Sequence, residues 1–416
     1  MNVPRLRFKE FRDNWLSTEL DKIATTSSGG TPNRAKPEYW GGSIPWVTTS
    51  LIDFNVINNS DEFITKEGLK NSSAKLFPKD TLLMAMYGQG KTRGKVAILG
   101  LEASTNQACA AITFHLNTIN IHFAFQNLAG RYDEIRDLSN AGGQENLSAG
   151  LIKQIKITFP SLTEQTKIAN FLTAIDEKIS QLTQKHDLLT QYKKGVMQQI
   201  FSQKLRFKDE DGREFPEWEE TILGKVADPA IRWSLTGGPF GSNLKAEDYT
   251  GNGIRIIQLQ NIGDGTFNDS YKIYTSENKA NELLSCNIYP NEIIISKMGD
   301  PVARCCIMPS SHDRYLMASD GIRLVVNRSL FNTKYIHDFI NYETFRKNAL
   351  EASTGSTRRR IGLDELKKLL VIYPCLTEQT KIANFLTAID DKITHTKTQL
   401  DAVKQYKKGL LQQLFV

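Results

Sequence analysis

Apolar residues recur along two stretches of the chain at alternating steps of four and three. In the first stretch these positions are Ile168, Leu172, Ile175, Ile179, Leu182, His186, Leu189, Lys193, Val196 and Ile200. In the second stretch they are Ile382, Leu386, Ile389, Ile393, Thr396, Leu400, Val403, Lys407, Leu410 and Leu414. Most of these residues are apolar, and a period of about 3.5 residues is typical of a coiled-coil seam. The pattern predicts two long helices; the first, from about residue 163 to 201, would be about 55 Å long.

Local signals predict where each helix starts. Pro160 and Pro374 disfavour helix before them. The threonines that follow, Thr163 and Thr377, are expected to cap the helices. A glutamate next to each threonine would then lie at the positive end of the helix dipole.

The two stretches are copies of one another. Leu162–Asp176 reads LTEQTKIANFLTAID, and Leu376–Asp390 has the same sequence. Further on, Gln191–Gly195 returns as Gln405–Gly409. Identity over such a run does not arise by chance, so the chain is an internal duplication.

A shorter repeated motif precedes each copy. Leu6–Lys9, which reads Leu-Arg-Phe-Lys, and Trp15 return as Leu205–Lys208 and Trp218. Between these points and the long helices the two copies share little. The order along the chain is therefore variable region, repeated helix, variable region, repeated helix.

This order predicts four segments: globular domains at 1–158 and 205–372, and repeated helices at 159–204 and 373–416. Because the order is nearly cyclic, we expect the helices to form an antiparallel coiled coil between the two domains. A pseudo-two-fold axis would then relate the halves. The alternative is that each helix packs only on its own domain. On the seam, His186, Lys193 and Lys407 are expected to snorkel or to face a partner rather than to catalyse.

Both variable regions have the pattern of an α+β domain, with short strands, turns and one late helix. In the first, the expected strands are Ile44–Thr48, Leu82–Tyr87, Lys95–Leu99, Cys109–Phe114 and Lys156–Phe159, with a helix near His122–Leu138. In the second, they are Ile254–Gln258, Glu292–Lys297, Cys305–Met308, Ile322–Val326 and Leu370–Tyr373, with a helix near Lys334–Leu350.

Composition narrows the classes of protein to consider. With 416 residues, of which 40% are hydrophobic, the chain is typical of globular protein in two or three domains. The 52 basic residues against 46 acidic ones permit nucleic acid as a partner without requiring it. The sequence has no apolar run of membrane-spanning length, and its basic first residues without an apolar run behind them predict no signal peptide. Five cysteines without a CxxC pair, and scattered histidines, indicate a reduced cytoplasm and no structural metal.

The loops between the predicted strands are rich in basic and amide side chains. Arginine and lysine suit phosphates or guanine edges, and asparagine and glutamine pair bidentately with adenine. The candidate DNA-binding residues of the first domain are Thr48, Thr49, Lys91, Arg93, Lys95, Asn106, Gln107, Gln144 and Asn146. Those of the second domain are Gln258, Gln260, Asn261, Lys297, Arg304, Arg358, Arg359 and Arg360.

Equivalent loops carry different side chains in the two copies. The basic loop Thr354–Arg360 stands where the first copy has Ala141–Asn146. Two domains that bind different DNA sequences would require different side chains at equivalent loops. For any single residue, a solvated polar loop is the alternative.

Motifs for catalysis or cofactor binding are missing from the sequence. Gly88–Thr92 resembles the end of a phosphate-binding loop, but Ala85 stands where that motif requires glycine, and a strand is expected to follow. The glycine-rich turn of an S-adenosylmethionine site and the tetrapeptides of amino-methyltransferases are absent too. So is the carboxylate set of metal-dependent nucleases. We predict no catalytic, cofactor-binding or metal-binding residues in this chain.

As a whole, the chain resembles the specificity (S) subunits of Type I restriction–modification systems. The resemblance rests on the duplicated pattern Pro-x-Leu-Thr-Glu-Gln-x-Lys-Ile-Ala, at Pro160–Ala169 and Pro374–Ala383. It rests also on the two Leu-Arg-Phe-Lys openings with their following tryptophan, and it covers essentially the whole chain.

The resemblance implies a role in DNA recognition. Each globular domain would be a target-recognition domain that reads one half of a split site in double-stranded DNA. The helices would be the spacer and the docking surface for two modification subunits, which carry an S-adenosylmethionine-dependent adenine methyltransferase. Restriction subunits would add translocation and cleavage. The cofactors S-adenosylmethionine, ATP and Mg are thus expected in the partner subunits, and this chain is expected to be non-catalytic.

Two other functions compete with this one. A free-standing DNA-binding regulator would use the same duplicated fold without a methyltransferase partner, and co-purification of a modification subunit would distinguish the two. A self-contained nuclease is disfavoured because the sequence lacks a metal-binding carboxylate set.

Overall fold

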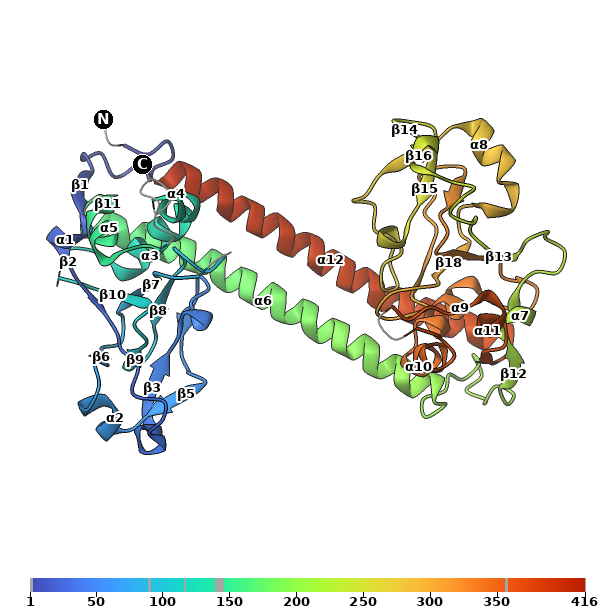
Figure 1. The fold of residues 1–416 in the computed structure, drawn as a ribbon, viewed down its shortest axis with the longest axis horizontal. Helices are drawn as coiled ribbons and strands as arrows, with labels where there is room; N and C mark the ends of the chain where they lie inside the picture. The colour runs from blue at the N-terminus through green and yellow to red at the C-terminus, as the bar shows by residue number, and fades with distance from the viewer. Residues whose placement is uncertain (1–2, 89–90, 116, 139–145, 356–357, 416) are drawn as a thin grey trace. The chain divides into compact units, whose positions relative to one another are not determined.

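The computed structural model describes residues 3–88, 91–115, 117–138, 146–355 and 358–415. The chain divides into two compact units, Met1–Gln184 with Lys397–Val416, and Lys185–Thr396 (Figure 1). Each unit thus contains one variable region, the start of one long helix and the end of the other. This division tests no boundary between a globular domain and a helix, so the four predicted segments stay a prediction.

The variable region of the first unit is built from short strands and small helices. The strands are β1 (Leu16–Glu19), β2 (Ala24–Ser28), β3 (Trp40–Val47), β4 (Val56–Ile57), β5 (Glu62–Ile64), β6 (Leu76–Phe77), β7 (Leu82–Ala85), β8 (Val96–Leu99), β9 (Ala103–Thr105), β10 (Cys109–Phe114) and β11 (Lys156–Phe159). The helices are α1 (Leu20–Ile23), α2 (Lys66–Lys70), α3 (Ile121–Gly130), α4 (Tyr132–Asp137) and α5 (Ala149–Gln154). The strands form sheets of order β2-β10-β7-β8-β4, β5-β3-β9-β6 and β1-β11.

The second unit repeats this plan. Its strands are β12 (Glu219–Ile222), β13 (Leu235–Gly237), β14 (Tyr249–Thr250), β15 (Ile254–Ile257), β16 (Ile273–Thr275), β17 (Asn287–Ile288), β18 (Ile293–Ser296), β19 (Cys305–Ile307), β20 (Tyr315–Met317), β21 (Gly321–Leu324) and β22 (Leu370–Tyr373). Its helices are α7 (Leu223–Val226), α8 (Glu277–Glu282), α9 (Thr333–Ile340), α10 (Glu343–Glu351) and α11 (Leu363–Lys367). The sheets have the orders β13-β21-β18-β19, β14-β16-β15-β20-β17 and β12-β22.

The predicted α+β class and the predicted strands are confirmed to within a few residues at their ends. The strands found from the sequence are the apolar ones, such as β7 and β18, whose residues are all buried. Each predicted late helix is instead two helices. The first breaks at Arg131, between α3 and α4, and the second at Asn341–Tyr342, between α9 and α10. Two-residue strands such as β4 were not predicted, because they are too short to show a period.

The two long helices are confirmed as α6 (Leu162–Phe201) and α12 (Leu376–Leu414). The predicted caps are wrong. Thr163 and Thr377 lie inside the first turn, because each helix begins one residue before its threonine. The amide of Gln165 donates to the carbonyl of Ser161 (3.0 Å), so the first hydrogen-bonded turn closes on Ser161.

The cores of both units take in the ends of the two long helices. In the first unit, Leu172 of α6 and Leu410 of α12 belong to one buried cluster. In the second unit, Leu386 of α12 and Val196 of α6 do the same. Within each unit the start of one helix is therefore buried with the end of the other, as an antiparallel pair requires. The alternative, in which each helix packs only on its own domain, is wrong.

Polar residues of the repeat hold the helices together within each unit. The ammonium group of Lys407 lies 2.5 Å from a carboxylate oxygen of Asp176 in the first unit. In the second unit Lys193 lies 2.6 Å from Asp390. Lys193 and Lys407 thus face the other long helix, as expected, and pair there with the repeated aspartates.

The Leu-Arg-Phe segment fastens the start of each long helix. Arg7 donates from Nε and Nη2 to the two carboxylate oxygens of Glu164, each at 2.8 Å. Arg206 does the same to Glu378, at 3.3 and 2.8 Å, and these hydrogen bonds raise the pKa of its guanidinium. The phenylalanine that follows each arginine packs edge-on against a repeated phenylalanine in the helix, with ring centroids at 6.1 and 5.6 Å. We call each arginine–glutamate pair with its phenylalanines a clasp.

The repeated glutamine links each long helix to a helix of the variable region. Gln165 accepts a hydrogen bond from the amide of Asn120 and donates to the carbonyl of Pro160, both at 2.8 Å. Gln379 likewise accepts from the amide of Asn332 at 2.8 Å. Asn120 and Asn332 are the N-caps of α3 and α9. The Glu-Gln pair of the repeat is therefore explained by the fold alone.

Among the described residues, no helix has both the length and the apolar character needed to cross a membrane.

We expect Arg206→Ala to lower the free energy of unfolding of the second unit by about 3–5 kcal/mol, because the fully buried carboxylate of Glu378 would lose its cation. Urea unfolding followed by circular dichroism measures this change. The control is Lys208→Ala, which removes an exposed ion pair with Glu214 and should cost about 0–1 kcal/mol. Equally small losses in both variants would show that the clasp does not stabilise the unit.

Candidate nucleic-acid interface

The predicted contact residues fall on four loops of the first unit and on three of the four corresponding loops of the second, and backbone geometry shows that the loops correspond. The first is a short 3-10 turn after a central strand, at Thr49–Leu51 after β3 and at Leu259–Asn261 after β15. The residue before each turn is extended, with φ and ψ of −107° and 167° at Thr48 and −105° and 172° at Gln258. Thr48 and Gln258 are therefore equivalent positions with different side chains.

The second loop is hydrogen-bonded to the strand end that precedes the first. The amide of Asn106 donates to the carbonyl of Val47 (3.0 Å) in the first unit. The amide of Ala318 donates to the carbonyl of Ile257 (2.9 Å) in the second. The turn between β9 and β10, which carries Asn106 and Gln107, is thus equivalent to the turn between β20 and β21.

A third loop, the hairpin that follows β7 or β18, joins the second. Met86 donates its amide to the carbonyl of Ala108 (2.9 Å), and Lys297 donates its amide to the carbonyl of Asp320 (2.7 Å). Lys91, Arg93 and Lys95 lie on this hairpin in the first unit, and Lys297 and Arg304 lie on it in the second.

The fourth loop precedes α5 or α11. The amide of Leu147 donates to the carbonyl of Met86 (3.0 Å), and the amide of Ile361 donates to the carbonyl of Lys297 (2.9 Å). Asn146 and Arg360 are therefore equivalent. The loops form one hydrogen-bonded chain in each unit, and this chain brings the predicted residues of each unit together.

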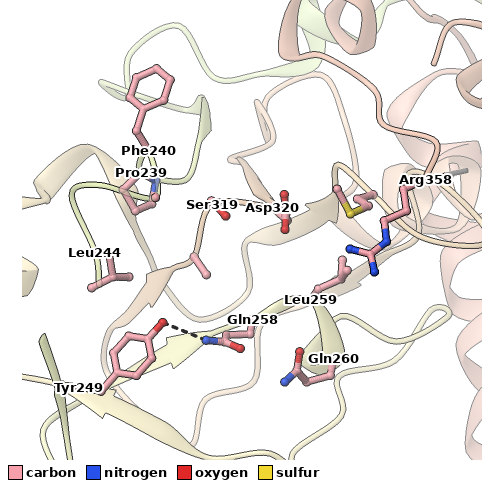
Figure 2. Close-up of a pocket in the computed structure, with 13 residues that line it drawn as sticks. Pro239, Phe240, Leu244, Tyr249, Gln258, Leu259, Gln260, Ser319, Asp320 and Arg358 are labelled. Carbon is pink, nitrogen blue, oxygen red and sulfur yellow. Dashed lines mark hydrogen bonds between the residues drawn. The ribbon is translucent and has the colours of Figure 1, made fainter. Parts of the chain in front are cut away.

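In the second unit several predicted side chains line one cavity of about 350 Å³ (Figure 2). Gln258 reaches across it and donates to the hydroxyl of Tyr249 at 3.2 Å. Gln260 and Arg358 are exposed at its edge. Amide and guanidinium groups of this kind hydrogen-bond to base edges and phosphates.

The side chains of two other predicted residues of this unit make hydrogen bonds inside the protein. Asn261 is fully buried and donates to the carbonyls of Asn268 (2.9 Å) and Tyr271 (2.8 Å). Arg304 donates to the carbonyls of Ile262 (2.6 Å) and Leu259 (3.1 Å). Both side chains hold the first loop in its shape, so their part in the site is to position Gln258 and Gln260.

A cluster of charges lies beside the cavity. Arg360 pairs with Asp320 at 3.1 Å, and the ammonium group of Lys297 donates to the carbonyl of Ser319 at 3.0 Å. Burial lowers the pKa of Lys297, and the neighbouring Arg360 guanidinium lowers it further. Arg358 and Arg359 are exposed beyond this cluster.

The corresponding residues of the first unit form a less basic surface. Lys95 pairs with Asp53 at 2.6 Å, and the carbonyl of Lys91 accepts a hydrogen bond from Tyr132 at 2.7 Å. The hydroxyl of Thr48 bonds to that of Ser50 at 2.6 Å. Of the remaining predicted residues, Thr49 and Arg93 are half-buried and Asn146 is exposed. The side chain of Asn106 accepts a hydrogen bond from the amide of Ala108 within its own turn. Gln144 lies outside the described residues.

Sequence reasoning missed a fifth loop, which begins at a Gly-Gly pair in both units: at Gly29–Gly30 after β2, and at Gly237–Gly238, of which Gly237 ends β13. Gly30 donates its amide to the carbonyl of Thr105, and Gly238 donates to the carbonyl of Gly321, both at 2.8 Å. These bonds attach the loop to β9 in the first unit and to β21 in the second, the strands that flank the second loop. The residues that follow include Thr31, which donates to Gln107, and Phe240 at the rim of the cavity. The repeated Gly-Gly pair was the signal that could have identified this loop.

In the part of the chain that the structure describes, no group of three or more His, Cys, Asp and Glu residues could hold a metal ion. Burial raises the pKa of Cys109 and of Cys306 to about 12, so both thiols remain protonated at neutral pH. After the loop that resembles a phosphate-binding motif comes strand β8, as expected, and Gln89 and Gly90 lie outside the described residues.

Comparison with known proteins gives a consistent result. The sequence family described as the Type I restriction modification DNA specificity domain matches residues 12–191 and 252–405. The Type I restriction enzyme MjaIX specificity subunit of Methanocaldococcus jannaschii is 22% identical over 418 residues, which cover 96% of this chain and 92% of that relative.

Solved structures share the fold over the whole chain. The S subunit of a Type I restriction–modification system from M. genitalium has a TM-score of 0.62 at 16% identity, covering 100% of this chain and 99% of that one. A chain from a study of complex assembly and conformational transition in the type I R-M system has a TM-score of 0.57 at 15% identity, covering 98% of both chains. These likenesses confirm the duplicated two-domain fold.

We expect Gly238→Ala to disrupt the fifth loop of the second unit, because a Cβ atom there would lie 1.9 Å from the carbonyl oxygen of Ala318. The overpacking should cost about 1–3 kcal/mol of unfolding free energy. Gly241→Ala is the matched control, since its Cβ would meet no atom within 4 Å. Urea unfolding of both variants measures the difference, and a stable Gly238→Ala variant would show that the close approach is not required.

Proposed function

Because the chain belongs to the Type I restriction–modification DNA specificity family, we propose that it is the DNA sequence-specificity subunit of such a complex. It reads a split, two-part site in double-stranded DNA and directs adenine methylation and restriction by partner subunits. The observation that carries this proposal is the loop network. The same backbone hydrogen bonds hold the same loops in both units, while the side chains on those loops differ.

Each unit would read one half of the site. In the second unit the amides of Gln258 and Gln260 suit the edge of adenine, and Arg358 and Arg359 suit phosphates or guanine. In the first unit hydroxyl and amide groups predominate at the equivalent places. The two half-sites would therefore differ in sequence, and contacts to phosphates would make the affinity depend strongly on salt.

The long helices would dock the partners and set the gap between half-sites. Contacts of the long helices within each unit explain why the buried residues of the repeat are identical in both copies. Several exposed residues of the repeat are identical too. Asn170 and Asn384 are one such pair. Tyr192 and Tyr406 are another, with 53% and 57% of each residue exposed. Two identical surfaces suit two copies of one partner, and tyrosine is enriched among residues that dominate binding energy.

The chemistry would belong to the partners. We propose two modification subunits, which would supply S-adenosylmethionine-dependent methylation, and restriction subunits, which would use ATP and Mg. This chain would contribute no catalytic group and would work beside its DNA in the cytoplasm. The exposed polar and basic side chains on the loops support a recognition role.

Methylated-adenine sequencing of the genome tests the function directly. We expect one split, two-part motif to lose its methylation when the gene for this chain is deleted, and to regain it on complementation. If no motif is lost although the modification subunit is expressed, the specificity role is contradicted. A free-standing regulator would then be the better description, and failure of a modification subunit to co-purify would support it.

Alanine at the exposed tyrosines tests the docking surfaces. Tyr192→Ala and Tyr406→Ala should each weaken the binding of one modification subunit by about 2 kcal/mol or more. The double variant should bind neither subunit at concentrations at which the natural chain binds two. Native mass spectrometry gives the stoichiometry.

The control for this experiment is Leu188→Ala. Leu188 is also exposed on α6, at 57%, but its counterpart in the repeat is Ala402, so a repeated contact cannot depend on it. Full occupancy by two subunits in the double tyrosine variant would move the docking surface elsewhere.

A further inference from the structure

Phe240 is the most exposed large apolar side chain in the part of the chain that the structure describes, with 83% of the residue accessible. A single exposed apolar residue is common on protein surfaces. Phe240 is unusual because of where it lies. It stands on the fifth loop of the second unit, at the rim of the cavity that the candidate DNA-contact residues line.

The loop holds Phe240 in place from both sides. On one side β13 pairs with β21, and Gly238 donates its amide to the carbonyl of Gly321. On the other side the amide of Asn243 donates to the carbonyl of Phe240 at 2.8 Å, and the side chain of Leu244 is buried. The exposed ring is therefore presented by an anchored turn.

The surroundings of the ring are those of a nucleic-acid surface. Figure 2 shows Phe240 pointing away from the cavity, while Gln258 lies inside it and Arg358 reaches over it from the opposite side. Of the acidic groups at this site, Asp320 is paired with Arg360. Amides, a guanidinium group and one projecting aromatic ring around the same cavity suit base edges, phosphates and the flat face of a base.

We propose that Phe240 is a wedge that enters the base stack of the second half-site while the amides of the cavity read the adjacent base pairs. Apolar wedges of this kind partly unstack a base step and kink the duplex. The proposal rests on the proposed function, and it adds a residue that contributes to specificity through the deformability of the step it opens.

The wedge belongs to one unit only. In the first unit the two glycines of the fifth loop are followed by Thr31, Pro32 and Asn33, and Pro32 is buried. No aromatic ring stands at that place. The distortion should therefore be confined to the half-site that the second unit reads.

Duplexes with 2-aminopurine test this, because its fluorescence rises when a base loses its stacking. The duplex carries the split site found by methylome sequencing. The probe replaces one adenine at a time in either half-site, leaving out the adenine that becomes methylated. The protein is the full chain with its modification subunits. We expect a rise at one step of the second half-site and none in the first.

The variants separate the wedge from its alternatives. Phe240→Ala should abolish the rise and lower the affinity for the split site about tenfold to a hundredfold. Phe240→Trp should keep both the rise and the affinity. Leu370→Ala, which removes an equally apolar side chain that is 55% exposed on β22, should behave like the natural chain.

Each outcome is decisive. If Phe240→Ala binds with unchanged affinity and gives the natural fluorescence pattern, the wedge is refuted and the specificity role stands. If the natural complex shows no preference for the split site over unrelated DNA, the proposed function fails, and the wedge fails with it.

Discussion

One buried ion pair in each unit determines how the rest is arranged. Glu164 and Glu378 lie in the first turn of a long helix with at most 1% of each side chain exposed. A buried carboxylate needs a cation, and the cation comes from Arg7 or Arg206, in the segment that opens a variable region. The same ion pair therefore joins the opening of a variable region to the first turn of the long helix that follows it.

The loops depend on a different constraint, which is carried by the backbone. The bonds from Asn106 to Val47 and from Ala318 to Ile257 are made by main-chain groups, so no side chain is needed to bring these loops together. Side chains on these loops that make no internal hydrogen bond, such as Gln260, can therefore differ between the copies without loss of this contact. A fixed scaffold and variable tips follow from the same hydrogen bonds.

The sequence predicted the parts of the fold that have long or buried patterns. The helix period and the duplication gave α6 and α12, and continuous apolar runs gave strands such as β18. Partners in space could not be predicted, because residue type does not say whether a polar group faces solvent. Asn261 and Arg304 have the chemistry of DNA contacts, yet the fold uses both internally. Phe240 was missed for the opposite reason, since phenylalanine in a sequence suggests core.

The two clasps are built from the same residues, and this affects how genes for such chains can recombine. Leu162–Asp176 and Leu376–Asp390 supply the same glutamate, glutamine, phenylalanine and aspartate to each unit. A variable region that opens with Leu-Arg-Phe and is followed by this stretch meets the same attachment points in either half. Recombination between genes through the shared stretch would therefore keep the clasp and the glutamine link intact when one recognition region is replaced. New pairs of half-sites would arise by reassortment in a single genetic event.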